Sequence, residues 1–385
     1  MENNRLLVID DDIMVFALIK KEAELYGYEV KWVPDLENLK GLFPSFDPSL
    51  IILDLKMGEL DGIAVIHYLQ QVSYEGFLIL MSGLDSKLII AAEEVVKINK
   101  INIMHSIRKP LQISLLRELL IEHSYRAEII SAEQILNGIV ENQFLVYYQP
   151  QISVSSKKVY ALEALLRWRY TSKTMLNPDQ FIPYAEKTET LIPLTFWVLN
   201  QVLEDMTRWE TQNINPAVSI NMPLSILNDP ANTDLILLTI KKKKIPFVRL
   251  VLEMTETGMI SLPNLAIDIT SRFRISGMSL AIDDFGTGNA SLSNLHKLPF
   301  NQLKIDKSFI CNLDTDLESQ KIVKAVVDLG HNLDMTIVAE GLENRESFAI
   351  LEKFGCDSAQ GFLIAKPMPE SDLLPWLKDM REGWV

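Results

Sequence analysis

The sequence predicts an α/β protein made of a doubly wound, five-stranded parallel sheet followed by a (β/α)8 barrel. Two patterns predict the barrel. Short apolar runs that end in a polar residue recur after residue 145, at spacings of roughly 20 to 40 residues, which suit one strand, one loop and one helix. Stretches with apolar residues at helical spacing, such as 194–209 and 320–329, lie between these runs.

The first 121 residues predict the doubly wound sheet. The runs 5–12 and 49–54 are apolar strands that end in acidic residues, and the run 77–82 ends in a hydroxyl. Amphipathic stretches over 15–26 and 62–71 separate these strands, as helices do in an alternating parallel sheet. We therefore expect this part to fold as one domain of alternating strands and helices.

Six runs in the second part are predicted as barrel strands. Each ends in a residue that could bind a metal or a phosphate, and chance explains one such residue more easily than six. We therefore expect these residues to gather on one rim of the barrel, where active sites of such barrels lie. The six runs are 159–163, 217–221, 250–253, 280–283, 303–306 and 336–340.

The segment 279–288 is the most informative of these. Asp283 and Asp284 end a short apolar strand, and a Phe-Gly-Thr-Gly loop follows them. Successive residues of a strand point to opposite faces, so the chain must bend before both carboxylates can serve one site. Paired carboxylates at a strand end suit a divalent metal, although Asp and Gly are also common in plain acidic turns.

The segment Glu163-Ala-Leu-Leu-Arg-Trp168 resembles the motif that names the EAL domain, and the similarity extends from about Ser131 to the C-terminus. The resemblance implies a phosphodiesterase that linearises cyclic di-GMP to pGpG with Mg²⁺ or Mn²⁺. The later motifs of this family are matched, in the same order, by Asn221, Glu253-Met-Thr-Glu256, Asp283-Asp284-Phe-Gly, Lys304-Ile-Asp306, Glu340-Gly-Leu-Glu343 and Gln360-Gly-Phe.

The resemblance implies two cations in each barrel site. A first would lie among Glu163, Asn221, Glu253 and Asp283, and a second near Asp283 and Asp284 with Glu340 nearby. These oxygen ligands suit Mg²⁺ or Mn²⁺ better than zinc, and the five histidines show no zinc-ligand spacing. Two cations can activate a water and stabilise the leaving oxygen of a phosphodiester.

The same resemblance assigns the other candidate residues of the site. Glu163, Lys304 and Glu340 would be catalytic, with Glu340 either contacting a metal or accepting the proton of the water. Arg167 would bind a substrate phosphate in bidentate fashion. The further substrate-binding candidates are Gln149, Leu166, Asp306 and Gln360, and Glu256 and Glu343 would support the site. Gln149, Gln360 and Glu343 could also be polar residues without a direct role.

The first part resembles a response-regulator receiver domain over residues 1–121. This resemblance implies that Asp54 accepts a phosphoryl group from a cognate sensor histidine kinase. It also implies that Asp10 and Asp11 help to hold one Mg²⁺, and that Ser82 and Lys109 contact the phosphoryl oxygens. A cation near the acceptor is chemically sensible, because it screens the approaching anion.

Two positions depart from the receiver pattern, and one from the barrel pattern. Gly58 occupies a usual proline position, and Ser106 stands where an aromatic switch residue is common. The segment Asn289-Ala-Ser291 replaces a frequent Tyr-Ser-Ser, without removing an acidic ligand. Phosphorylation could therefore be retained while its transmission differs.

Composition agrees with two soluble domains in a reducing cytoplasm. The chain has 385 residues, of which 48% are hydrophobic, and only Cys311 and Cys356 as cysteines. No signal peptide and no apolar run of about 20 residues are present, so no membrane insertion is expected. The net charge of −14 argues against nucleic-acid binding, and the cluster 241–244 of lysines is typical of a solvated helix end.

The domains are expected at residues 1–121 and 131–385, joined by a helical linker over 122–130. The linker lacks glycine and proline, so a stiff helix could couple the two domains. We expect a homodimer or a higher homo-oligomer. Two function classes remain open: a phosphodiesterase regulated by phosphorylation, and a catalytically silent receptor or scaffold. The complete ligand set favours the enzyme.

Overall fold

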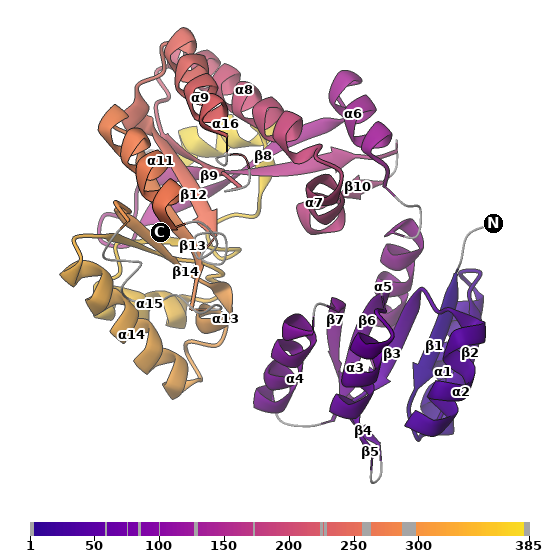
Figure 1. Cartoon of the computed structure of the whole chain (residues 1–385). Helices are drawn as coiled ribbons and strands as arrows, with labels where there is room; N and C mark the ends of the chain where they lie inside the picture. Colours follow the sequence, from indigo (N-terminus) through magenta and orange to yellow (C-terminus); the bar gives the residue numbers. More distant parts are fainter. Residues whose placement is uncertain are drawn as a thin grey trace. The chain divides into compact units, whose positions relative to one another are not determined.

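The computed structural model describes residues 4–380, except 58–59, 75, 84–85, 100, 127–129, 172–173, 224–225, 227–228, 256–262 and 287–297. The chain divides into two compact units, Met1–Ile130 and Ser131–Val385, which are described separately below (Figure 1).

The first unit is built on a five-stranded parallel sheet with the strand order β2-β1-β3-β6-β7. The reversal of strand order beside β1 is typical of a doubly wound fold, so this prediction is confirmed. The strands are β1 (Arg5–Ile9), β2 (Glu29–Val33), β3 (Leu50–Asp54), β6 (Phe77–Ser82) and β7 (Asn102–Arg108), with a short pair β4 (Lys56–Met57) and β5 (Leu60–Asp61) beside them.

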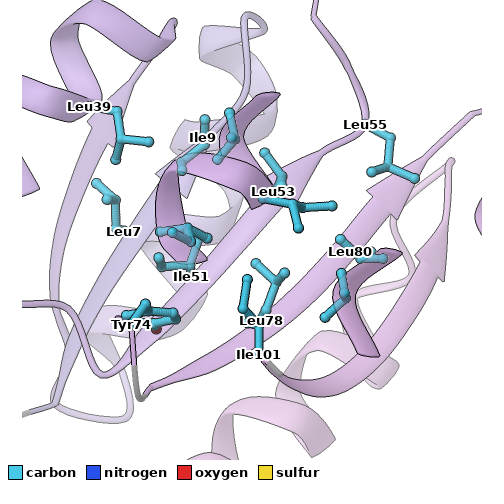
Figure 2. Close-up of a cluster of buried hydrophobic side chains, with 14 of the residues drawn as sticks. Leu7, Ile9, Leu39, Ile51, Leu53, Leu55, Tyr74, Leu78, Leu80 and Ile101 are labelled. Atoms are coloured by element: carbon cyan, nitrogen blue, oxygen red, sulfur yellow. The ribbon is translucent and has the colours of Figure 1, made fainter. Parts of the chain in front are cut away.

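Helices cover both faces of this sheet. Side chains alternate along each strand, so Leu7 and Ile51 face one core while Leu6 and Ile52 face the other. Figure 2 shows the first core, which is buried beneath α2, α3 and α4, whereas α1 and α5 cover the opposite face. The helices are α1 (Ile13–Glu24), α2 (Leu36–Phe46), α3 (Gly62–Gln71), α4 (Ser86–Ile98) and α5 (Ile113–Arg126).

The helix α5 continues beyond residue 121 into the segment predicted as a helical linker. Its last five residues, 122–126, belong to that segment, and 127–129 lie outside the described residues. The ring of His123 is buried, with Nδ1 2.6 Å from the hydroxyl of Tyr28 and Nε2 3.1 Å from the carbonyl oxygen of Ser49. The beginning of the linker is therefore held against the core of the first unit.

The second unit contains a closed barrel of eight strands, as predicted. The hydrogen-bonded order runs β9-β11-β12-β13-β14-β15-β16-β8, and β8 pairs again with β9. The strands are β8 (Phe144–Ser153), β9 (Val159–Arg169), β11 (Ala217–Asn221), β12 (Leu250–Thr255), β13 (Ser279–Phe285), β14 (Gln302–Ile305), β15 (Thr336–Ala339) and β16 (Ser358–Gln360), with β10 (Met175–Leu176) and β17 (Met368–Pro369) at the margins.

One strand of the barrel runs against the others. β8 is antiparallel to both of its neighbours, β9 and β16, whereas the remaining neighbours in the barrel are parallel. A short turn joins β8 to β9, with Lys157 at a φ of 56°. The N-terminal part of β8 therefore lies beside the C-terminal ends of the parallel strands, at the rim that carries the candidate site.

Helices surround the barrel, as Figure 1 shows for α8, α9, α11 and α14. Lys241, Lys242 and Lys243 form the last turn of α9, in agreement with the predicted helix end. The helical elements are α6 (Ala132–Val140), α7 (Pro178–Lys187), α8 (Leu191–Glu210), α9 (Pro230–Lys243), η2 (Phe247–Arg249), α11 (Pro263–Ser276), α13 (Lys307–Ile310), α14 (Leu317–Asn332), α15 (Arg345–Phe354) and α16 (Glu370–Asp379).

The predicted strand ends at Glu253 and Asp283 lie two residues before the observed ends, and the predicted end at Glu163 differs more. The sequence placed Glu163 at the end of a strand, but β9 continues to Arg169 because it pairs with β8 along most of its length. Both cysteines are free, with Cys356 buried and Cys311 partly exposed. Within the described residues, none of the helices combines the length and the apolar character needed to cross a membrane.

Candidate active site

The ammonium group of Lys304 lies at the centre of a cluster of carboxylates at the rim of the barrel. Lys304 is on β14 and is almost fully buried. Its Nζ lies 2.8 Å from Glu253 Oε2, 2.9 Å from Asp283 Oδ1, 2.6 Å from Glu340 Oε1 and 3.6 Å from Glu163 Oε1. Five strands or strand ends thus bring together five residues that the sequence assigned to the site.

The chain bends at Asp283 and Asp284, as the sequence analysis required. The register between β13 and β14 shifts after Ile282, and Asp284 has a φ of 55°. This left-handed conformation interrupts the strict alternation of the strand. As a result, Asp283, Asp284 and Glu340 each offer a carboxylate oxygen within 4.8 Å of the others.

Hydrogen bonds from amides orient Glu163. Its Oε2 accepts a hydrogen bond of 2.5 Å from Gln360 Nε2, and Asn221 Nδ2 lies 3.4 Å from its Oε1. Gln360 Nε2 also donates to Gln149 Oε1 at 2.9 Å. Gln149 and Gln360 are both buried, and their amides are joined by this hydrogen bond inside the barrel.

Burial and the neighbouring carboxylates raise the pKa of three carboxyl groups in the cluster, those of Glu253, Asp284 and Glu340. Burial raises the pKa of Glu340 from 4.5 to about 8, even though the nearby Lys304 opposes this shift. Burial and the charge of Asp283 raise the pKa of Asp284 to about 6. Burial also raises the pKa of Glu253 well above its usual value, whereas the surrounding carboxylates together outweigh burial and raise the pKa of Lys304.

This arrangement fits divalent cations. Glu163, Glu253, Asp283 and Glu340 share the ammonium group of Lys304, and buried charges that are incompletely balanced are costly. Oε1 of Glu253 is buried with no hydrogen-bond partner among the described residues. Carboxylate and amide oxygens are the ligands that Mg²⁺ and Mn²⁺ prefer.

Arg167 lies on the same face of β9 as Glu163, four residues further along the strand. Its guanidinium is half-buried, donates from Nη1 to the carbonyl oxygen of Leu166 at 2.7 Å, and lies 5.6 Å from the ring centroid of Tyr147. The alternation of the strand turns the side chain of Leu166 to the opposite face. Leu165 shares the face of Glu163, and Leu166 stays a prediction as a substrate-binding residue.

The remaining candidates have other surroundings. Asp306 accepts a hydrogen bond from the backbone N–H of Ser308 at 2.9 Å and begins α13, so one of its oxygens acts as a helix cap. Glu343 is exposed on the loop after β15. Glu256 lies outside the described residues, as do Gly58 and the segment 289–291.

The sheet of the first unit carries a second acidic cluster. Asp10, Asp11 and Asp54 each offer a carboxylate oxygen within 4.8 Å of the others. Lys109 Nζ lies 2.7 Å from Asp54 Oδ2 and 3.1 Å from Asp10 Oδ2. Burial is the main cause of the raised pKa of Asp10.

Ser82 and Ser106 lie on the neighbouring strands of the same sheet. Ser82 ends β6 and is buried, and its carbonyl oxygen accepts from the N–H of Lys109 at 2.9 Å. Ser106 lies on β7, where its hydroxyl oxygen is buried without a hydrogen-bond partner among the described residues. The structure thus brings the predicted receiver residues to one edge of the sheet.

The comparisons with known proteins match both units. The EAL domain family matches residues 132–367, and the response regulator receiver domain family matches residues 6–121. The chain is 30% identical over 341 residues to the cyclic di-GMP phosphodiesterase RocR of Pseudomonas aeruginosa, with 85% of this chain and 86% of RocR covered.

Two further similarities concern the barrel unit. The chain is 35% identical over 238 residues to the cyclic di-GMP phosphodiesterase PA2567 of Pseudomonas aeruginosa, covering 62% of this chain and only 40% of that relative. The solved structure of the PaMucR phosphodiesterase in complex with c-di-GMP has a TM-score of 0.60 and 32% identity, covering 63% of this chain and 98% of the other. The chain belongs to the EAL domain family and carries a response regulator receiver domain before the barrel.

Proposed function

We propose that the protein hydrolyses cyclic di-GMP to linear pGpG with two divalent cations. The observation that carries this proposal is the buried Lys304 surrounded by four carboxylates at the rim of the barrel. The relatives named as cyclic di-GMP phosphodiesterases support the choice of substrate. A silent receptor is less favoured, because every predicted metal ligand of the barrel is present in the sequence.

We assign different roles in hydrolysis to the residues of this site. Glu163, Asn221, Glu253 and Asp283 would hold one Mg²⁺ or Mn²⁺, and Asp283, Asp284 and Glu340 would hold the other. Bound cations would supply a more acidic water and screen the charge of the phosphate. Lys304 keeps a positive charge where the attacked phosphate gains negative charge.

Proton transfer completes the reaction. Glu340 is the candidate to accept the proton of the attacking water, because its carboxylate lies beside Lys304 and the aspartate pair. The new bond joins the water oxygen to phosphorus as the bond to the 3′ oxygen of the ribose breaks. The proton that Glu340 takes from the water then passes to the departing 3′ oxygen, so the product carries a 3′ hydroxyl and a 5′ phosphate.

The direct test is turnover by the purified chain. In buffer with Mg²⁺, chromatography should show the conversion of cyclic di-GMP to pGpG, and EDTA should stop it. A matched control is Glu346→Gln, which removes an exposed carboxylate from the first turn of α15. Tight binding of cyclic di-GMP without any conversion would instead favour the receptor function.

Metal and pH should act together on stability. Because the pKa of Glu340 is raised to about 8, the folded metal-free chain retains a proton that the unfolded chain releases above about pH 4.5. The stabilisation from this proton is complete below that value and is lost as the pH rises through about 8. Thermal unfolding in EDTA should therefore show a Tm that falls between about pH 6 and about pH 8.5.

Divalent cations replace these protons, so the gain in Tm from Mg²⁺ should be larger at the higher pH. Glu340→Gln should reduce the fall of Tm with rising pH that is measured in EDTA, since the side chain of glutamine does not titrate. A gain in Tm from Mg²⁺ that is the same at both pH values would contradict a metal site built on these carboxylates.

Replacing Arg167 should weaken substrate capture. A contact between guanidinium and phosphate exists before the reaction, so Arg167→Gln should raise KM roughly tenfold or more and lower kcat less. Steady-state kinetics measure both constants. Arg272→Gln is a matched control, because Arg272 pairs with Asp234 on the outer helices. An unchanged KM with a large fall in kcat would place Arg167 at the transition state.

We further propose that phosphorylation of Asp54 by a sensor histidine kinase regulates the barrel. The cluster of Asp10, Asp11 and Asp54 with Lys109 supports one Mg²⁺ and a phosphoryl group there. Residues 122–126 are helical, so the segment that leads from the first unit begins as a stiff helix and supports transmission of a conformational change toward the barrel. We also propose that the protein acts in the cytoplasm as a homo-oligomer. It would neither bind nucleic acid nor insert into a membrane.

Beryllofluoride, which mimics a phosphoryl group, should raise the rate of hydrolysis several-fold. A tenfold change would need about 1.4 kcal/mol of coupling between the two units. The rate should be measured with and without beryllofluoride, for the wild type and for Asp54→Ala, which should not respond. Equal rates under all four conditions would mean that the first unit does not control catalysis.

A further inference from the structure

A third glutamine, Gln151, lies beneath the amides of the candidate active site. Gln151 is on β8 and is only 1% exposed. It lies directly opposite Gln360 in the antiparallel pair of β8 and β16, and its Nε2 donates to Gln360 Oε1 at 2.8 Å. The sequence analysis did not select Gln151, because this contact joins residues 209 positions apart.

The hydrogen bonds around Gln151 have a fixed direction. The carbonyl oxygen of Ala365 can only accept, so Gln149 must turn its amino group toward it, at 3.0 Å. Oε1 of Gln149 then accepts from Nε2 of Gln360, which also donates to Glu163. This leaves Oε1 of Gln360 facing Gln151, whose amino group supplies the matching donor.

Reversing the amide of Gln360 would be costly. Its oxygen would then face Oε2 of Glu163 and Oε1 of Gln149, and both of these atoms are acceptors. Its amino group would face the amino group of Gln151. All four side chains are buried, so water does not compensate for lost hydrogen bonds. Gln151 therefore stabilises the one orientation in which Gln360 donates to Glu163.

We propose that Gln151 is a positioning residue of the phosphodiesterase site. It fixes the amide of Gln360 and, through it, the carboxylate of Glu163. Oε2 of Glu163 is then occupied by Gln360, and Oε1 is directed toward Lys304 and the cation site. The inference rests on the proposed function, in which Glu163 is a metal ligand.

Two substitutions at Gln151 separate orientation from simple packing. Gln151→Met removes the donor, and Gln151→Glu places an acceptor of almost the same shape against Oε1 of Gln360. Loss of a residue that orients a metal ligand usually costs about 10–100-fold in metal affinity or activity. We expect losses in that range for Mn²⁺ affinity and kcat, larger for Gln151→Glu, with little change in KM.

A buried glutamine elsewhere in the barrel provides the control. Gln302 on β14 is similarly buried and contributes no side chain to the described carboxylate cluster. Gln302→Met should lower Tm as Gln151→Met does, but it should leave the Mn²⁺ affinity and kcat close to those of the wild type. Calorimetric titration with Mn²⁺ measures the affinity independently of turnover.

A double-mutant cycle with Gln360→Met tests whether Gln151 acts through Gln360. In the Gln360→Met background, Gln151→Met should cause no further loss of Mn²⁺ affinity. Independent losses that multiply, or a Gln151→Met protein with wild-type Mn²⁺ affinity and kcat, would overturn the proposal. Absence of turnover by the wild type would count against the proposed function, whereas the Mn²⁺ affinities would still decide the role of Gln151. A wild type without Mn²⁺ affinity would overturn both.

Discussion

Glu163→Gln is expected to abolish hydrolysis of cyclic di-GMP while the barrel remains folded. The substitution removes one negative charge and one candidate metal ligand, and it preserves the shape of the side chain. In the wild type, Gln360 Nε2 donates a hydrogen bond of 2.5 Å to Glu163 Oε2. In the variant, Gln360 can still donate to the amide oxygen of the substituted side chain. Two-cation sites supply most of the barrier reduction in phosphodiester cleavage, so we expect a fall in kcat of at least about 10³-fold.

Single-turnover measurements with enzyme in excess should report this loss, because they separate chemistry from product release. Circular dichroism and Tm should stay close to those of the wild type, and Mn²⁺ affinity should fall. Glu163→Ala should give the same loss of activity. Hydrolysis at the wild-type rate by either variant, in saturating Mg²⁺, would show that the metal site is assigned to the wrong carboxylates.

Lys304→Met should have the second large effect, on both stability and activity. The substitution leaves four carboxylates buried around a neutral side chain, and removing one partner of a buried ion pair typically costs about 3–5 kcal/mol. We expect a clear fall in Tm in EDTA. We also expect hydrolysis to fall by at least about 10³-fold, since the positive charge beside the attacked phosphate is lost.

Added Mg²⁺ should distinguish the loss of stability from the loss of activity in Lys304→Met. Cations can neutralise the carboxylates, so Mg²⁺ should restore much of the Tm of Lys304→Met, while the activity should stay low. Lys324→Met is a suitable control, because Lys324 pairs with Asp328 on the outer helix α14. Full activity of Lys304→Met in Mg²⁺ would restrict Lys304 to a structural role.

Much of the fold and of the acidic cluster followed from local sequence patterns. The strand end at Asn221 was predictable because an apolar run stops there, and the bend at Asp284 followed from the alternation of side chains along a strand. The same alternation places the side chain of Leu165, and not that of Leu166, on the face of Glu163, whereas the motif alone does not distinguish the two leucines.

Other parts of the site depend on contacts that the local sequence does not contain. The position of Glu163 in the middle of β9 follows from its antiparallel pairing with β8, which places Gln149 directly opposite Glu163. The amide chain through Gln151 and Gln360 depends on the register of β8 and β16, which is set when the barrel closes. A sequence pattern shows neither register.

The antiparallel β8 also has a consequence for the order of folding. Its pairing with β9 needs only a short turn, so Gln149 can reach Glu163 early, at a small cost in chain entropy. Its pairing with β16 joins Gln151 to Gln360 across 209 residues, and such distant contacts form slowly. The donor to Glu163 therefore arrives only with the last barrel strand to be synthesised, and a growing chain cannot complete this site before its barrel is closed.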